Sequence, residues 1–253
     1  MGETILLLKL ESPMQSWGTR SRWDIRDTGF EPTKSGVVGL LGCAMGISRN
    51  DLALEELDKA LLFGVRIDRP GLIATDYHTV TGYHRTAEGK IKCAENHMFD
   101  SLSKAIEHKE ATIVSPRDYL HDASFLVALA VKQERKTANP NILEMLAAKL
   151  KNPKWPLYLG RKSCVPTLPI FYKLVDEYQN IEEAVKKEKI LVSRSPRCET
   201  PAVIDAWIEN DDGDQERQDV LRINRLRFYD FRNCKRIPVK TEDIEKVRWE
   251  DIK

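Results

Sequence analysis

The 253-residue sequence lacks three features that would place it in a specialised class of protein. Its five cysteines are an odd number without a C-x-x-C pair, which argues against a disulfide scaffold and favours a reducing compartment. The apolar run at 5–8 is too short for a signal peptide, and that at 36–47 is below the roughly 20 residues needed to span a bilayer. With 40 Lys+Arg against 39 Asp+Glu, the net charge is +1. The sequence therefore predicts a cytoplasmic protein without membrane contact, in which any basic surface is local.

A stretch near the start, FEPTKSGVVGLLGCAMG at 30–46, comes close to a nucleotide phosphate loop. That loop requires G-x-x-x-x-G-K-[ST], so that its second glycine lets backbone N–H groups wrap the phosphates. Gly29 begins the count, but Thr33 occupies the place of the second glycine. The stretch instead predicts a helix that begins near Lys34 and Ser35, and a helix N-terminus attracts phosphate.

Four glycines follow at intervals of three, three and four residues: Gly36, Gly39, Gly42 and Gly46. This spacing places them on one helix face. Interior glycine costs a helix about 0.5–1 kcal/mol relative to alanine. The pattern therefore predicts a helix packed tightly against a sheet, or one that other backbone approaches closely.

The order of apolar and amphipathic segments predicts an α+β protein. Its expected core is ferredoxin-like (RRM-like), with a βαββαβ order of elements. The supporting segments are strands at 4–10, 61–68 and 123–131, and helices at 34–46, 51–60 and 141–151.

The polar, histidine-rich stretch between 72 and 120 predicts an excursion from this core. We expect a protruding hairpin, or thumb, at 75–120, with its turn at 87–89 and a partly disordered insert from 93 to 112. Beyond 173 the pattern weakens into an acidic turn, a cationic strand or hairpin at 222–239 and a solvated tail or terminal helix. The whole chain, 1–253, is expected to form a single domain with 173–253 as a C-terminal extension of additional β elements.

Cationic and aromatic side chains gather in the expected loops. Arginine and lysine neutralise phosphates, while aromatic rings and guanidinium planes stack on unpaired bases, and single-stranded RNA recognition uses both. For each residue taken alone, an ordinary surface cation or core aromatic is the alternative. The set is Trp17, Arg20, Arg22, Trp23, Lys34, Tyr83, His84, Arg85, Arg117, Tyr119, Arg161 and Lys162.

An RNA-cleaving enzyme would need a base for the 2′-hydroxyl and an acid for the leaving oxygen. The candidates are His78, His84 and His121, with Tyr83 and Tyr119 as weaker helpers. Their spacing follows no diagnostic pattern, so a structural or RNA-contacting role stays open for each.

No metal site or other cofactor is expected. Cys93, His97 and His108 lack the compact four-ligand spacing of a closed zinc site. The acidic turn at 211–214 departs from the spacing of an EF-hand loop and predicts a solvated turn.

Four stretches of the sequence carry a family resemblance. They are 12–22 (SPMQSWGTRSR), 32–47 (PTKSGVVGLLGCAMGI), 117–129 (RDYLHDASFLVAL) and 158–164 (YLGRKSC). In order and content, the sequence over about 4–172 resembles the fifth family of CRISPR-associated proteins, in the RAMP superfamily and in the branch of type I-E Cascade surveillance complexes.

This resemblance implies a ferredoxin-like fold with a thumb. It also implies a non-catalytic, antiviral-defence subunit that caps the 5′ handle of the CRISPR RNA beside the backbone and large subunits, and meets target DNA through the complex. A related branch, type I-C, uses its fifth-family protein as a metal-independent endoribonuclease, and this is the enzymatic alternative.

The resemblance assigns RNA contacts to four parts of the sequence: the first stretch, the helix start, the thumb and the glycine-containing turn at 160–163. With the cations and aromatics above, the predicted RNA-binding residues are Gln15, Trp17, Arg20, Arg22, Lys34, Ser35, Gly36, Tyr83, His84, Arg85, Arg117, Tyr119, Arg161, Lys162 and Ser163.

Overall fold

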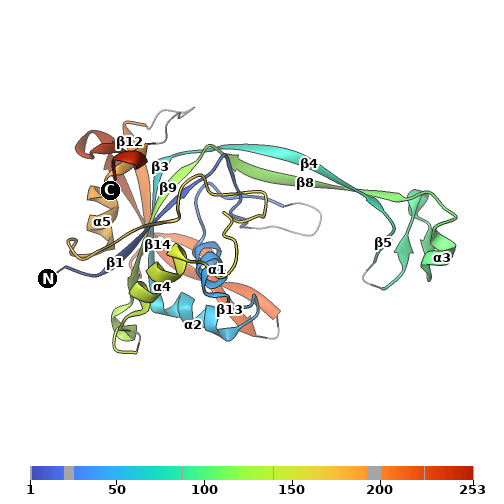
Figure 1. Ribbon diagram of the computed structural model, residues 1–253, viewed down its shortest axis with the longest axis horizontal. Helices are drawn as coiled ribbons and strands as arrows, with labels where there is room; N and C mark the ends of the chain where they lie inside the picture. Colours follow the sequence, from blue (N-terminus) through green and yellow to red (C-terminus); the bar gives the residue numbers. More distant parts are fainter. Residues whose placement is uncertain are drawn as a thin grey trace.

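A seven-stranded sheet forms the centre of the body (Figure 1). The computed structural model describes residues 2–19, 26–86, 88–138, 140–192, 201–224 and 226–252. Neighbouring strands of the sheet are all antiparallel. In spatial order they are β10 (Phe171–Val175), β1 (Ile5–Glu11), β9 (Ser124–Val131), β3 (Leu61–Arg69), β12 (Val203–Glu209), β14 (Leu226–Lys240) and β13 (Gln215–Asn224).

The central strands read as near-continuous apolar runs because both faces of the sheet are covered. Every residue of β1 is buried, as is every residue of β9 except Val131. Helices α1 (Lys34–Met45), α2 (Leu52–Ala60) and α4 (Ile142–Lys151) pack on one face, and α5 (Ile181–Lys187) packs on the other (Figure 1). These elements confirm the core strands predicted at 4–10, 61–68 and 123–131, the helices predicted at 34–46, 51–60 and 141–151, and the α+β class.

Helix α1 begins and ends where its sequence requires. The Thr33 hydroxyl accepts a hydrogen bond from the backbone N–H of Gly36, and Gly46 ends the helix with a left-handed φ of 77°. A Cβ on Gly36 would lie 3.0 Å from the ring of Trp17. Side chains, not backbone, therefore approach this glycine face, and the region beside Gly39 is open.

A cluster of charged side chains is buried inside the sheet. The Lys9 ammonium lies 3.0 Å from Asp68, and the Arg66 guanidinium donates to the same carboxylate at 2.6 Å. Arg66 also donates to the backbone carbonyls of Val185 and Glu188, which fixes the end of α5 against β3. Burial alone would raise the pKa of Asp68, but the Arg66 and Lys9 charges hold that pKa below its ordinary value.

A long two-stranded arm leaves the body between β3 and β9 (Figure 1). Its strands, β4 (Leu72–Gly82) and β8 (Ala111–His121), pair over eleven positions, and every β4 residue except Gly82 is exposed. The base of β8 also pairs with β2 (Met14–Gln15).

The arm ends in a small folded tip, which corrects the prediction of a partly disordered insert at 93–112. The tip holds β5 (His84–Arg85), β6 (Ile91–Lys92), η1 (Ala94–Asn96), β7 (Met98–Phe99) and α3 (Leu102–Ala105). Of the predicted turn at 87–89, residues 88 and 89 lie between β5 and β6, and residue 87 is outside the described residues. The arm as a whole runs from 72 to 121. Buried Ile91, Cys93 and Ala105 form a local core, which is why this polar stretch still folds.

The C-terminal region adds β12, β13 and β14 to the central sheet and then a short parallel pair. That pair joins β11 (Ile190–Val192) to β15 (Lys246–Arg248), flanked by η3 (Thr241–Asp243) and η4 (Trp249–Asp251). The last residues therefore pack on the body, contrary to the predicted solvated tail or helix. Among the described residues, no helix is long and apolar enough to cross a membrane.

We predict that Asp68→Asn lowers the free energy of unfolding by about 3–5 kcal/mol, because it leaves Lys9 and Arg66 buried without their counter-charge. Since the folded pKa of Asp68 lies below the unfolded value, its contribution is complete above about pH 4 and is lost as the pH falls through the folded pKa. Urea denaturation of both proteins between pH 7 and pH 3 should show this difference narrowing in acid. Asp205→Asn, which removes an exposed pair with Arg236, serves as the control and should change stability little; a similar loss in both variants would contradict the prediction.

Candidate functional site

The predicted site residues of the first and last stretches meet at the base of the arm. There the turn at 158–164 contacts the segment at 15–19 and the segment at 26–29, and it also contacts β8. Three stretches far apart in the sequence are thus brought to one surface.

Gly160 fixes the position of this turn. Its φ is +99°, in the left-handed region that favours glycine, and a Cβ there would lie 1.7 Å from the carbonyl oxygen of Ser16. The Ser16 N–H also donates to the carbonyl of Leu159 at 3.0 Å. A side chain at 160 would therefore separate the turn from the first stretch.

Arg161 joins the turn to the arm. Its guanidinium lies 4.6 Å from the centre of the Tyr119 ring and donates to the backbone carbonyls of Asp118, at 3.0 Å, and Arg26, at 2.9 Å. A third hydrogen bond reaches the carbonyl of Asp27. Arg161 thus organises the surface through four contacts within the protein.

Tyr119 is almost fully buried beneath this guanidinium. Burial raises the pKa of its hydroxyl, but hydrogen bonds with Ser163 and Arg161, together with the Arg161 charge, outweigh burial and leave the pKa below its ordinary value. The Ser163 hydroxyl lies 3.5 Å from that of Tyr119. Tyr119 is therefore held as a supporting side chain rather than an exposed stacking platform.

Among the described residues at the base of the arm, three cations remain available: Arg26, Arg117 and Lys162. None has a carboxylate partner within the described ranges of the chain, and the Nε of Arg117 is buried without a hydrogen-bond acceptor. Lys162 is exposed on the turn, and Arg26 pairs by backbone with Arg117. These three side chains can meet phosphate without first breaking an ion pair.

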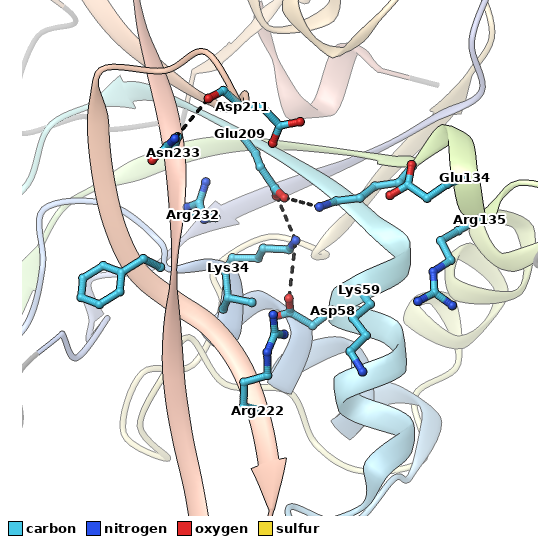
Figure 2. Close-up of a pocket in the computed structure, with 13 residues that line it drawn as sticks. Lys34, Asp58, Lys59, Glu134, Arg135, Glu209, Asp211, Arg222, Arg232 and Asn233 are labelled. Atoms are coloured by element: carbon cyan, nitrogen blue, oxygen red, sulfur yellow. Dashed lines mark hydrogen bonds and ion pairs between the residues drawn. The ribbon is translucent and has the colours of Figure 1, made fainter.

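Lys34 lies in a different place from the one predicted. It is buried, and its ammonium lies 2.9 Å from Glu209 and 3.5 Å from Asp58 (Figure 2). Its backbone N–H donates to Asp219 at 2.6 Å. The predicted phosphate contact is corrected, because the charge of Lys34 is already neutralised inside the protein.

Three further predicted contacts are also replaced by structural roles. Gln15 is buried and donates to the carbonyl of Ala123, while its own carbonyl accepts from the Trp17 indole. Trp17 is 1% exposed and packs against Gly36. Ser35 is also buried, so this part of the family motif builds the helix–sheet contact rather than a surface.

The predicted residues of the thumb lie at the far end of the arm. Tyr83 donates to the carbonyl of His108, one His84 ring nitrogen lies 3.0 Å from the carbonyl of Val80, and Arg85 donates to the carbonyl of Gly89. The long ribbon between them and Arg161 makes the tip a separate surface from the base. Arg20, Arg22 and Trp23 lie outside the described residues.

The structure does not bring the catalytic candidates together. His78 pairs with Ser115 and His121 pairs with Leu72, six residues further along the ribbon, or about 20 Å at the rise of a strand. His84 lies further still toward the tip. His78 shares a face of the ribbon with Tyr119 and His121 because it pairs with Ser115, but only Tyr119 and His121, two residues apart on β8, lie close together.

Sequence reasoning missed Arg26 and the exposed ring of Phe30. Phe30 is 64% exposed and follows the segment that Arg161 holds. The only signal for either was its position beside the arginine-rich first stretch. Within the part of the chain that the structure describes, no three His, Cys, Asp or Glu side chains are grouped to hold a metal.

Comparison with known proteins gives one family. The family model described as CRISPR-associated protein (Cas_Cas5) matches residues 5–233. The chain is also similar to the CRISPR system Cascade subunit CasD of Escherichia coli (strain K12), with 38% identity over 177 residues, 66% of this chain and 69% of that protein.

Solved structures give the same result. A chain described as "CRISPR RNA-guided surveillance complex" has a TM-score of 0.68 and 30% identity, covering 98% of this chain and 95% of the other. A second, described as "Crystal structure of Cas protein", has a TM-score of 0.65 and 32% identity, covering 96% of this chain and 98% of the other.

We expect Arg161→Lys to lower the free energy of unfolding by about 2 kcal/mol, since an ammonium cannot reproduce the fork of hydrogen bonds or its stacking on Tyr119. Chemical denaturation would measure the loss. Lys162→Ala, the neighbouring exposed cation, is the matched control. Equal stability of the two variants would show that Arg161 does not hold the surface together.

Proposed function

Because the chain belongs to the Cas5 family of CRISPR-associated proteins, we propose that it is a non-catalytic subunit of a type I-E Cascade surveillance complex that binds CRISPR RNA and caps its 5′ handle in the cytoplasm. The observation that carries this proposal is the surface at the base of the arm. There Arg26, Arg117 and Lys162 lie beside a glycine-containing turn, without carboxylate partners in the described chain.

Phosphate binding at this surface follows from charge and geometry. Lys162 and Ser163 are exposed on a turn that Arg161 and Gly160 hold in place. An exposed aromatic ring, Phe30, follows the adjoining segment. Cations for the backbone and a ring for an unpaired base are the combination that single-stranded RNA requires.

A ferredoxin-like core within a single 1–253 domain is part of the proposal. The spatial order β10-β1-β9-β3, with all pairs antiparallel, supports this assignment. In the chain, α1 and α2 connect β1 to β3, and α4 connects β9 to β10. The extension at 173–253 adds strands to the same sheet, which favours one domain over two.

The thumb, 75–120 within the longer arm, is proposed to contact the adjacent backbone subunit, with the large subunit and target DNA met through the complex. An isolated two-stranded ribbon is at best marginally stable in water. Tyr77 and Leu72 are about 70% exposed on β4, and Val114 is exposed on β8. A neighbour that covers the ribbon would bury these side chains.

A handle endonuclease remains the alternative, and the separation of the histidines opposes it. His78 and His84 lie too far along the ribbon to share one scissile phosphate with His121. The remaining pair, Tyr119 and His121, includes a tyrosine that is buried and hydrogen-bonded within the protein.

Alanine at Arg117 or Lys162 should weaken binding of handle RNA and lower the slope of log affinity against log salt by about 0.7 for each lost phosphate contact. Fluorescence anisotropy with a labelled handle strand across a salt series measures both quantities. Lys149→Ala, an exposed cation on α4, is the control of equal charge change. Unchanged affinity and slope in the Arg117 and Lys162 variants would remove the arm base from the RNA interface.

Incubation of the purified chain with end-labelled CRISPR repeat RNA in EDTA should leave the RNA intact, because the acid and base candidates are not assembled. Denaturing gels would record cleavage. A single defined cut that His121→Ala abolishes would overturn the non-catalytic assignment and favour the endonuclease.

A further inference from the structure

Strand β4 is a long edge strand without the features that normally protect such an edge. It lies at one side of the three-stranded sheet β2-β8-β4 along the arm (Figure 1). Its eleven residues, Leu72–Gly82, pair with β8 without a register shift and include no Lys, Arg or Pro. We propose that β4 pairs, antiparallel, with β4 of a second copy of this chain, so that two copies form a dimer through their arms.

Two other long edges of the molecule are blocked. Along β8, β2 pairs at the base, Arg26 bridges to Arg117, and the neighbouring Pro116 has no N–H to offer. Along β13, Asp58 and Glu55 of α2 accept outward-facing N–H groups. Natural proteins protect long edges in such ways because an open edge invites pairing with another chain. Strand β4 has no comparable cover within the described chain, so a strand can be added there.

The contacts of β8 identify which backbone groups β4 presents outward. The Arg26 N–H donates to the carbonyl of Pro116, and the Asp118 N–H donates to the carbonyl of Arg26. Even-numbered residues of β8 therefore point away from β4. Because Tyr77 pairs with Pro116 and backbone groups alternate along a strand, the odd-numbered residues of β4 direct their N–H and C=O groups away from β8. They are Ile73, Thr75, Tyr77, Thr79 and Thr81.

These outward groups define one register in which the two strands overlap completely. Tyr77 is the middle residue of β4, so a two-fold axis between the Tyr77 residues of two copies pairs the whole of both strands. Outward residues then face outward residues, as an antiparallel ladder requires. Each facing pair of outward residues exchanges two hydrogen bonds, which gives about ten backbone hydrogen bonds between the copies. The antiparallel direction puts the two bodies at opposite ends of the paired arms.

In this register the facing side chains complement each other. Asp76 lies opposite His78 of the second copy, and the symmetry of the pair repeats this contact. Thr75 lies opposite Thr79, and the two Tyr77 rings meet at the axis. Opposite-charge, Thr–Thr and aromatic pairs across two strands all stabilise a sheet. The Asp76–His78 pair needs no particular charge state of the imidazole, because the neutral ring also carries an N–H donor.

The neighbouring registers lack this complementarity. An axis at residue 76 sets two Asp76 carboxylates against each other, which is destabilising. An axis at residue 78 sets two His78 rings against each other and leaves Asp76 opposite Val80. Within one chain, His78 lies 3.8 Å from Asp76, and the two side chains are 45% and 59% exposed. A contact so exposed to water is weak, so both side chains can also pair across the dimer.

Pairing also supports the arm itself. A two-stranded ribbon is at best marginally stable in water, whereas three or more strands are stable, and the dimer joins the two arms into a four-stranded sheet. It places a strand beside the exposed side chains of Leu72, Tyr77 and Val80. A neighbouring subunit that covers the arm would compete with the second copy, so the dimer protects the arm before assembly. This competition rests on the proposed function, whereas the dimer does not.

Two proline substitutions at facing positions of the arm test which edge is used. Thr79→Pro removes an outward N–H of β4, and Val114→Pro, directly opposite on β8, removes an N–H that points to the other edge. Sedimentation equilibrium of the full-length chain, from micromolar to submillimolar concentration, measures dimer dissociation. We expect Thr79→Pro to weaken the dimer at least about tenfold, because symmetry removes two hydrogen bonds, and Val114→Pro to change it less than about twofold. Thermal unfolding checks that both variants fold.

An exchange of charges tests the register. His78→Asp sets carboxylates opposite each other at two places and should weaken the dimer about tenfold. Adding Asp76→His to that variant restores both opposite pairs and should recover most of the affinity. No recovery in the double variant would overturn the register.

A chain that stays monomeric at every concentration would overturn the dimer, as would equal effects of Thr79→Pro and Val114→Pro. A monomeric chain whose Thr79→Pro variant alone fails to join a Cascade complex would assign the edge to a strand of another subunit. These measurements contain no RNA, and Arg117 and Lys162 are unchanged in every variant. Failure of the dimer is therefore distinguishable from failure of handle binding.

Discussion

The structure depends on how one buried charge is neutralised. Lys34 begins α1 with its ammonium inside the protein, where an unpaired charge would cost several kcal/mol. Its partners come from three other elements: Asp58 from α2, Glu209 from β12 and, through the backbone N–H, Asp219 from β13. Burial favours the protonated form of Glu209, but the charges of Lys34 and Lys132 hold its pKa below the ordinary value. Because Lys34 requires these carboxylates, β12 and β13 lie where Glu209 and Asp219 reach the start of α1.

The same carboxylates protect the edge of the sheet. Strand β13 has one strand neighbour, so some of its backbone groups face outward, and such edges invite pairing with other chains. Asp58 accepts from the N–H of Leu221, and Glu55 accepts from the N–H of Ile223. Acidic side chains on α2 thus take the place of an eighth strand.

Local patterns in the sequence were sufficient to predict the strands and helices of the core. The apolar runs of β1 and β9, and the cap before α1, predicted the correct elements because each depends on neighbours in the chain. The site was harder to predict, because exposure depends on distant partners. Lys34 and Arg161 look alike as cations beside glycines, yet one is neutralised by β12 and the other holds three backbone carbonyls. The fold of the tip around Cys93 likewise follows from contacts that no short pattern records.

Both strands of the arm continue strands at the centre of the sheet. Strand β3 runs into β4 across Pro70 and Gly71, and β8 runs into β9 across Asp122 and Ala123. Asp122 has a left-handed φ of 60°. Its carbonyl accepts a hydrogen bond from the Arg69 guanidinium at the end of β3, which joins the two crossings to each other. The arm is consequently an extension of the paired strands β3 and β9 of the central sheet. The two strands that carry the tip are therefore the same two that pair side by side at the centre of the sheet, and the arm is joined to the most buried part of the body rather than to a surface loop.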